Sequence, residues 1–129
     1  MNPIPRSEIS IGIDPALRGR LGAIASSGSL VLDYFASRRC SVTVGDLTAD
    51  VRTDAPGSGF VELAPVEGVR LYAQVRLLPI LREAGPSLRL GRGVFGRHLA
   101  VGLEQPERWI AFLEEPGVLA RRRPFRSAH

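Results

Sequence analysis

Residues 69–77 alternate between apolar and polar side chains without a break. A period of two predicts a half-buried strand, because successive side chains of an extended chain point to opposite faces. Pro79 is expected to end this strand, since proline cannot donate to a backbone ladder. The apolar positions, which share one face, are Val69, Leu71, Ala73, Val75 and Leu77.

A second alternating run, at residues 99–103, leads into a short amphipathic helix. Pro106 fits the first turn of that helix, and Pro116 with Gly117 ends it. A helix this short is marginal in water on its own, so its apolar side must pack on the sheet or on a partner. The residues expected to form this core or interface anchor are Trp109, Ile110, Phe112 and Leu113.

Shorter apolar runs precede the alternating strand and predict several more strands. Two hairpins are expected among them, one around residues 26–29 and one with a two-residue turn at Gly45 and Asp46. The chain is therefore expected to be α+β and β-dominated, a single antiparallel β-barrel or sandwich of about seven strands with one C-terminal helix. Expected strand runs are Ile9–Ile13, Leu21–Ala25, Leu30–Phe35, Ser41–Val44, Leu47–Thr53 and Phe60–Leu63.

With 129 residues, the chain is long enough for one domain and short for two. We expect a flexible arm over residues 1–8, a single β-rich domain over residues 9–117 and a basic, mobile tail over residues 118–129.

Three stretches resemble the bacterial pleckstrin-homology-like domains, over roughly residues 41–115. They are SVTVGDLTADVRTD, VELAPVEGVRLYAQV and LRLGRGVFGRHLAVGLEQPERWIAFLEE. The resemblance implies a bent barrel of seven strands closed by a C-terminal helix. On this interpretation the protein is a small non-catalytic binding or scaffold module of unknown ligand, and residues 1–40 fall outside the resemblance.

Residues 11–17, IGIDPAL, are similar to the first strand of the RuvC-type resolvases of the RNase H-like superfamily. That similarity implies a metal-dependent nuclease in which Asp14 binds Mg²⁺ and Glu62 is a second ligand. The alternative is that Asp14 and Pro15 only end a strand with a turn, which both residue types favour. No helical pattern separates Asp14 from Glu62, as that fold would require, so no metal site is expected.

All 17 basic residues are arginines. The absence of lysine excludes a Walker A loop and a Schiff-base enzyme, and no cofactor is expected. Eleven of the arginines follow residue 69, which favours an anionic partner such as nucleic acid or acidic lipid, or simply a solvated surface. An arginine-rich nucleic-acid-binding protein is therefore a further alternative. The candidate anion-binding residues are Arg92, Arg97, Arg121, Arg122, Arg123 and Arg126.

The N-terminus lacks the apolar core of a signal peptide, and no run is long and apolar enough to span a membrane. A single cysteine, Cys40, excludes an intramolecular disulfide. We expect a cytoplasmic protein that binds an unidentified protein partner or forms a homo-oligomer.

Overall fold

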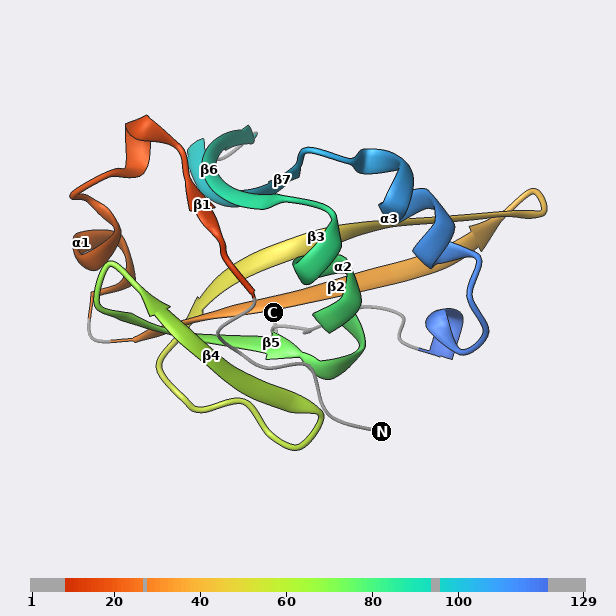
Figure 1. The fold of residues 1–129 in the computed structure, drawn as a ribbon, viewed down its shortest axis with the longest axis horizontal. Helices are drawn as coiled ribbons and strands as arrows, with labels where there is room; N and C mark the ends of the chain where they lie inside the picture. The colour runs from red at the N-terminus through yellow and green to blue at the C-terminus, as the bar shows by residue number, and fades with distance from the viewer. Residues whose placement is uncertain (1–8, 27, 94–95, 121–129) are drawn as a thin grey trace.

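The computed structural model describes residues 9–26, 28–93 and 96–120, and its strands form two sheets (Figure 1). The larger sheet has four strands in the order β3-β2-β5-β4, and the smaller has three in the order β1-β6-β7. The strands are β1 (Gly12–Ile13), β2 (Ser29–Arg39), β3 (Val42–Arg52), β4 (Phe60–Val66), β5 (Val69–Gln74), β6 (Pro86–Gly93) and β7 (Gly96–Leu103).

Within the described residues, two α-helices and two 3₁₀ helices connect these strands, and one of each kind follows the last strand. The expectation of a β-dominated α+β domain with seven strands and a helix after the last strand is confirmed, but α1 and α2 were not expected. The helices are η2 (Pro15–Leu17), α1 (Leu21–Ala25), η3 (Val75–Leu77), α2 (Leu78–Glu83), α3 (Pro106–Leu113) and η4 (Val118–Ala120).

The two sheets do not close into a barrel, and their pairing is mixed. β1 runs parallel to β6, and β2 runs parallel to β5, whereas the other pairs are antiparallel. The expectation of an antiparallel barrel or sandwich is wrong in these respects. Parallel neighbours need long connections, so local hairpin signals in the sequence could not reveal them.

β2 and β3 form a long ribbon in which eleven consecutive pairs run from Ser29–Arg52 to Arg39–Val42. The predicted turn at Gly45 and Asp46 is wrong, because both residues lie inside β3. The turn that does join the strands is at Cys40 and Ser41, which have φ values of 48° and 70°. In Figure 1 this end of the ribbon extends past α3, away from the rest of the molecule.

Two other expectations fail because a helix replaces a strand. Residues 21–25 form α1, in which Leu21 and Ala25 are both buried one turn apart. The alternation of residues 69–77 is a strand only as far as Gln74, whose side-chain Oε1 accepts a hydrogen bond from the Arg76 backbone N–H at 2.6 Å and starts η3. Pro79 then lies in the first turn of α2, where its missing N–H has no cost.

One core joins both sheets and all three α-helices. Leu30, Leu32 and Tyr34 of β2 form its centre and are fully buried. α3 covers Tyr34 with Phe112, whose ring meets the tyrosine ring edge-on with 5.1 Å between centroids. Of the four predicted anchor residues, Phe112 and Leu113 are buried and Trp109 is partly buried, whereas Ile110 is 64% exposed and faces away.

The described chain ends in η4, which belongs to the core. Val118 is fully buried, and its carbonyl accepts a hydrogen bond from the Tyr34 hydroxyl at 3.5 Å. The folded domain therefore reaches past the predicted boundary at residue 117, and the rest of the predicted tail lies outside the described residues. In the described ranges, none of the helices combines the length and apolarity needed to cross a membrane.

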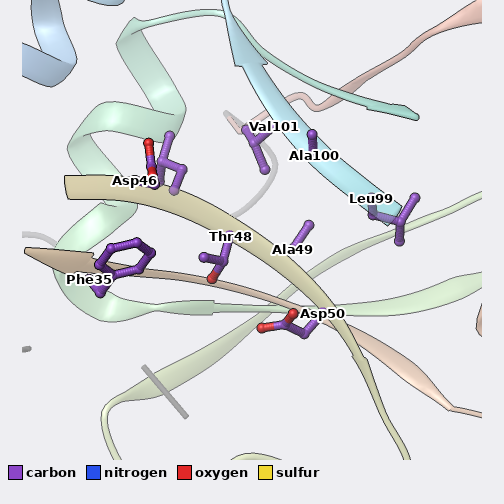
Figure 2. A pocket seen from close by; sticks show the side chains of 9 residues that line it. Phe35, Asp46, Thr48, Ala49, Asp50, Leu99, Ala100 and Val101 are labelled. Carbon is purple, nitrogen blue, oxygen red and sulfur yellow. The ribbon is translucent and has the colours of Figure 1, made fainter. Parts of the chain in front are cut away.

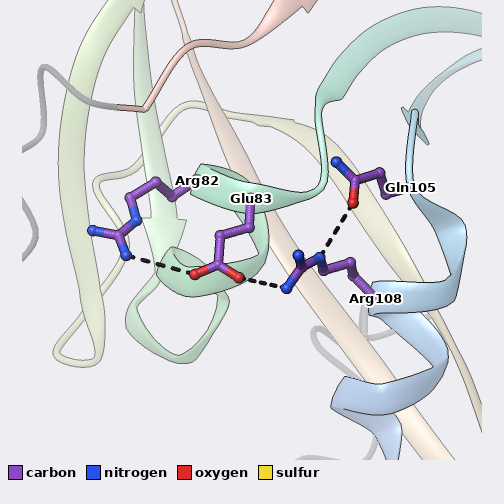
Figure 3. A network of polar contacts seen from close by, with 4 residues as sticks. All are labelled: Arg82, Glu83, Gln105 and Arg108. Carbon is purple, nitrogen blue, oxygen red and sulfur yellow. Dashed lines mark hydrogen bonds and ion pairs between the residues drawn. The ribbon is translucent and has the colours of Figure 1, made fainter.

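A polar network joins α2 to α3 on the surface (Figure 3). Arg108 of α3 donates to Glu83 at 2.8 Å and to the side-chain oxygen of Gln105 at 3.3 Å. Arg82 adds a longer contact of 3.5 Å to the same glutamate. These side chains are 40–49% exposed, so solvent and salt weaken the pairs.

We expect Arg108→Ala to lower the free energy of unfolding by about 0.5–1 kcal/mol, because an exposed ion pair contributes little. Urea denaturation of both proteins measures the loss, and it should shrink at 1 M salt. Arg70→Ala is the matched control, since Arg70 and Glu62 are 3.9 Å apart and more exposed. If the loss of stability in Arg108→Ala were the same at low and high salt, an ionic role for Arg108 would be contradicted.

Candidate binding groove

The two faces of the β2–β3 ribbon differ in chemistry. Leu30, Leu32, Tyr34 and Ala36 point into the core, so Val31, Asp33 and Phe35 point to the other face. On β3 the residues directly opposite these three are Asp50, Thr48 and Asp46. One face of the ribbon therefore carries three aspartates beside a threonine and a phenylalanine.

A groove of about 440 Å³ runs between this part of β3 and strand β7 (Figure 2). β3 is the outer strand of one sheet and β7 is the outer strand of the other. Within the described residues the two strands lie next to each other without pairing and no further strand pairs with either, so the groove separates two sheet edges. It is lined by Phe35, Asp46, Leu47, Thr48, Ala49, Asp50, Leu99, Ala100 and Val101.

Trp109 closes one end of the open β3 edge. Its Nε1–H donates to the carbonyl of Gly45 at 3.1 Å, so that carbonyl points away from β2. Backbone groups alternate in direction along a strand, and Leu47 and Ala49 therefore also turn their N–H and C=O groups outward. Beyond the Trp109 contact the edge offers backbone donors and acceptors to a further strand.

The Thr48 hydroxyl has no hydrogen-bond partner within the described residues, although the oxygen atom is buried. A buried hydroxyl without a partner costs free energy, of the order of 1–3 kcal/mol. It lies in the wall of the groove between the two exposed aspartates of β3. A ligand that supplied a donor or an acceptor here would remove that cost.

The pKa of Asp50 is raised above its ordinary value of 3.8. The main cause is desolvation, because its carboxyl group is partly surrounded by protein although the residue as a whole is exposed. Repulsion by buried Asp33 raises the pKa further, and Arg52 opposes the shift. A cation in the groove would restore the ordinary preference for the ionised form.

We expect Asp50→Asn to stabilise the protein at pH 7 by up to about 0.5 kcal/mol. The folded-state pKa is raised, so the ionised carboxylate costs stability above that pKa, and the cost disappears as the pH falls through it. The gain should therefore vanish below pH 3.8, where Asp50 is protonated in both states. Urea denaturation across pH tests this, and Asp54→Asn, which removes the same charge from the loop after β3, is the control.

The residues proposed for a nuclease site do not meet. Asp14 follows β1 in the three-stranded sheet, and its Oδ1 accepts a hydrogen bond from the Ala16 N–H at 3.1 Å, as in a turn. Glu62 lies on β4, at the far edge of the other sheet, 3.9 Å from Arg70. In the described part of the chain, no three His, Cys, Asp or Glu residues are grouped closely enough to hold a metal ion.

The predicted anion-binding residues are described only in part. The backbones of Arg92 and Arg97 pair across the β6–β7 hairpin, but their side chains lie outside the described set. Arg121, Arg122, Arg123 and Arg126 all fall beyond the last described residue.

Sequence reasoning missed the groove residues because Gly45 and Asp46 looked like a turn. A signal was present, since Leu47, Ala49 and Val51 alternate with Thr48, Asp50 and Arg52 as in one continuous strand. The part contributed by β7 could not be found in this way, because the two edges approach only in the folded chain. Comparisons with protein-family models, curated proteins and solved structures found no match.

Proposed function

We propose that this chain is a small binding or scaffold module without catalytic activity, and that its β3–β7 groove holds an extended segment of a partner protein carrying arginine or lysine. The observation that carries the proposal is the edge of β3 that no described strand pairs with, beside the carboxylates of Asp46 and Asp50. An exposed strand edge binds extended peptides through backbone hydrogen bonds, and the neighbouring side chains set specificity.

The lining favours a cationic side chain over a neutral one. Asp46 and Asp50 supply negative charge. Leu99 and Val101 provide apolar surface for the methylene part of a long basic side chain.

The proposed resemblance to pleckstrin-homology-like domains is compatible with this function. Its support is the division of seven strands into sheets of four and three, followed by a helix after the last strand. The parallel pairs β1–β6 and β2–β5 depart from an antiparallel barrel. The groove, rather than the family, therefore carries the functional proposal.

Binding of two labelled peptides, blocked at both ends, tests the proposal. The sequence VRVRVRV should bind, and VEVEVEV should not, because the charges of the groove repel it. In the groove variant, Asp46→Asn with Asp50→Asn, we expect the affinity for VRVRVRV to fall at least about tenfold, or about 1.4 kcal/mol. Fluorescence anisotropy at low salt measures both affinities, and binding should weaken as the pH falls through the raised pKa of Asp50.

Glu62→Gln is the matched control, since it removes an exposed carboxylate at the opposite edge of the same sheet. Equal binding of the two peptides, or equal affinity of the groove variant and the wild type, would contradict the proposal. Duplex DNA is a third probe. Salt-dependent DNA binding that the groove variant retained would favour a nucleic-acid-binding protein instead.

A further inference from the structure

The free end of the β2–β3 ribbon is basic, exposed and apolar in part. Residues 37–42 are all exposed, and Arg38 and Arg39 are the only charged residues between Asp33 and Asp46. Val42 and Val44 next to the turn are 54% and 38% exposed. We call residues 37–42 the ribbon tip.

The side chains of the tip match the groove in kind and in charge. Arg39 lies opposite Val42 within the tip, and Ser37 of the tip lies opposite Val44 just behind it, so this face at the end of the ribbon combines a cation with two branched apolar side chains. The groove combines two aspartates with apolar residues of β7. An arginine that entered it would meet carboxylates, and the valines would meet Leu99 and Val101.

The tip of one molecule cannot reach its own groove. Both lie on β3, where Val42 precedes Asp46 by four residues and Asp50 by eight, roughly 13–26 Å along an extended strand. The ladder between β2 and β3 is continuous over this length, without a bulge at which the ribbon could fold back. A ribbon tip that fills the groove must therefore come from another molecule.

We propose that the ribbon tip of one copy docks in the β3–β7 groove of a second copy. The inference rests on the proposed function of the groove and names its partner. We propose a heterologous contact rather than a reciprocal two-fold pair: once one contact forms, one copy keeps a free tip and the other a free groove, so copies add head to tail. A contact this small and charged is weak and sensitive to salt.

Sedimentation velocity under reducing conditions tests the inference; the reductant prevents disulfides between copies at exposed Cys40. The wild type should grow in mean mass with concentration at low salt, and less at high salt. The tip variant, Arg38→Gln with Arg39→Gln, should associate at least tenfold more weakly, and so should the groove variant. Arg18→Gln with Arg20→Gln removes the same charge from two exposed residues between η2 and α1 and should associate as the wild type does.

Mixing the two variants is the decisive measurement. The tip variant has an intact groove and the groove variant has an intact tip, so one strong contact can form between them. The mixture should produce a one-to-one pair that grows no further. A symmetric contact through either surface would not produce this result.

Three outcomes would overturn the inference. The first is a wild type that stays monomeric and variants that do not pair on mixing. The second is a tip variant that associates like the wild type. The third is association that survives in the tip variant but is lost in a chain ending at Ala120, which lacks the four arginines of residues 121–129. If VRVRVRV still binds the groove in any of these cases, the proposed function stands and only the partner is wrong.

Discussion

Replacing Trp109 with alanine is expected to lower the free energy of unfolding by roughly 3 kcal/mol, near the lower end of the range for large aromatic residues in a core. The indole ring stacks on Phe112 with 5.1 Å between centroids and meets Tyr34 edge-on at 6.1 Å. Its N–H also satisfies the Gly45 carbonyl. A domain of this size has a free energy of unfolding of only about 5–15 kcal/mol, so the variant should retain little stability.

Two further substitutions separate the parts of this contact. Trp109→Phe keeps an aromatic ring but loses the hydrogen bond, and should cost about 1 kcal/mol plus the lost ring contacts. Ile110→Ala, one residue further along α3, is the control, because Ile110 is 64% exposed and its removal should change stability by less than about 0.5 kcal/mol. Urea denaturation followed by circular dichroism measures all three. Equal effects of Trp109→Ala and Ile110→Ala would mean that α3 is not anchored through this face.

The prediction of α3 from sequence succeeded because several local signals agreed. Pro106 and Glu107 mark its start, the apolar residues recur at helical spacing, and Pro116 and Gly117 follow its end. The same reasoning could not say that Ile110 would be exposed. Helical spacing gives the width of an apolar stripe, but the surface on which the helix packs decides which edge of the stripe is buried. Tyr34 forms part of that surface and lies more than seventy residues away in the sequence.

The prediction of a strand at residues 21–25, where the structure has α1, failed for a different reason. Five residues, LGAIA, are too few for periodicity to separate a strand from one turn of helix. The burial of Leu21 and Ala25 on one side, with Gly22 and Ala23 exposed between them, fits a helix. Leu21 and Ala25 pack in the same core as Leu30 and Leu71, and this packing favours the helix. The pattern of residues 21–25 alone does not reveal that packing.

The groove could be predicted from the sequence only in part. Asp46, Thr48 and Asp50 could have been assigned to one face of a strand from alternation alone. That this strand forms a sheet edge, and that a second open edge lies beside it, depends on the parallel pair β2–β5 and on the position of β7. Such pairings join distant parts of the chain, so a single sequence does not specify them locally.

Gly45 is the position at which an added side chain is expected to lower the stability of the fold most. A Cβ atom added there would lie far inside the contact distance of the Phe35 carbonyl oxygen and 3.0 Å from the Cα of Ala36. Both are backbone atoms of β2, so no side chain can move aside to relieve the overlap. β2 and β3 would have to separate at Gly45, whose carbonyl also accepts the hydrogen bond from Trp109. The substitution would therefore disturb both the strand pairing and the packing of α3 on the ribbon.

We therefore expect Gly45→Ala to cost roughly 3 kcal/mol or more, above the usual cost of one added methyl group in a core. Gly22→Ala is the matched control: apart from its chain neighbours and the backbone of its own helix, no atom lies within 4 Å of its added Cβ, and alanine favours α1 by up to about 1 kcal/mol. Urea denaturation should move the two midpoints in opposite directions. Because Gly45→Ala already displaces the acceptor of the Trp109 hydrogen bond, adding Trp109→Phe should cost less in that background than in the wild type. Full additivity would show that the glycine and the tryptophan act on separate parts of the fold.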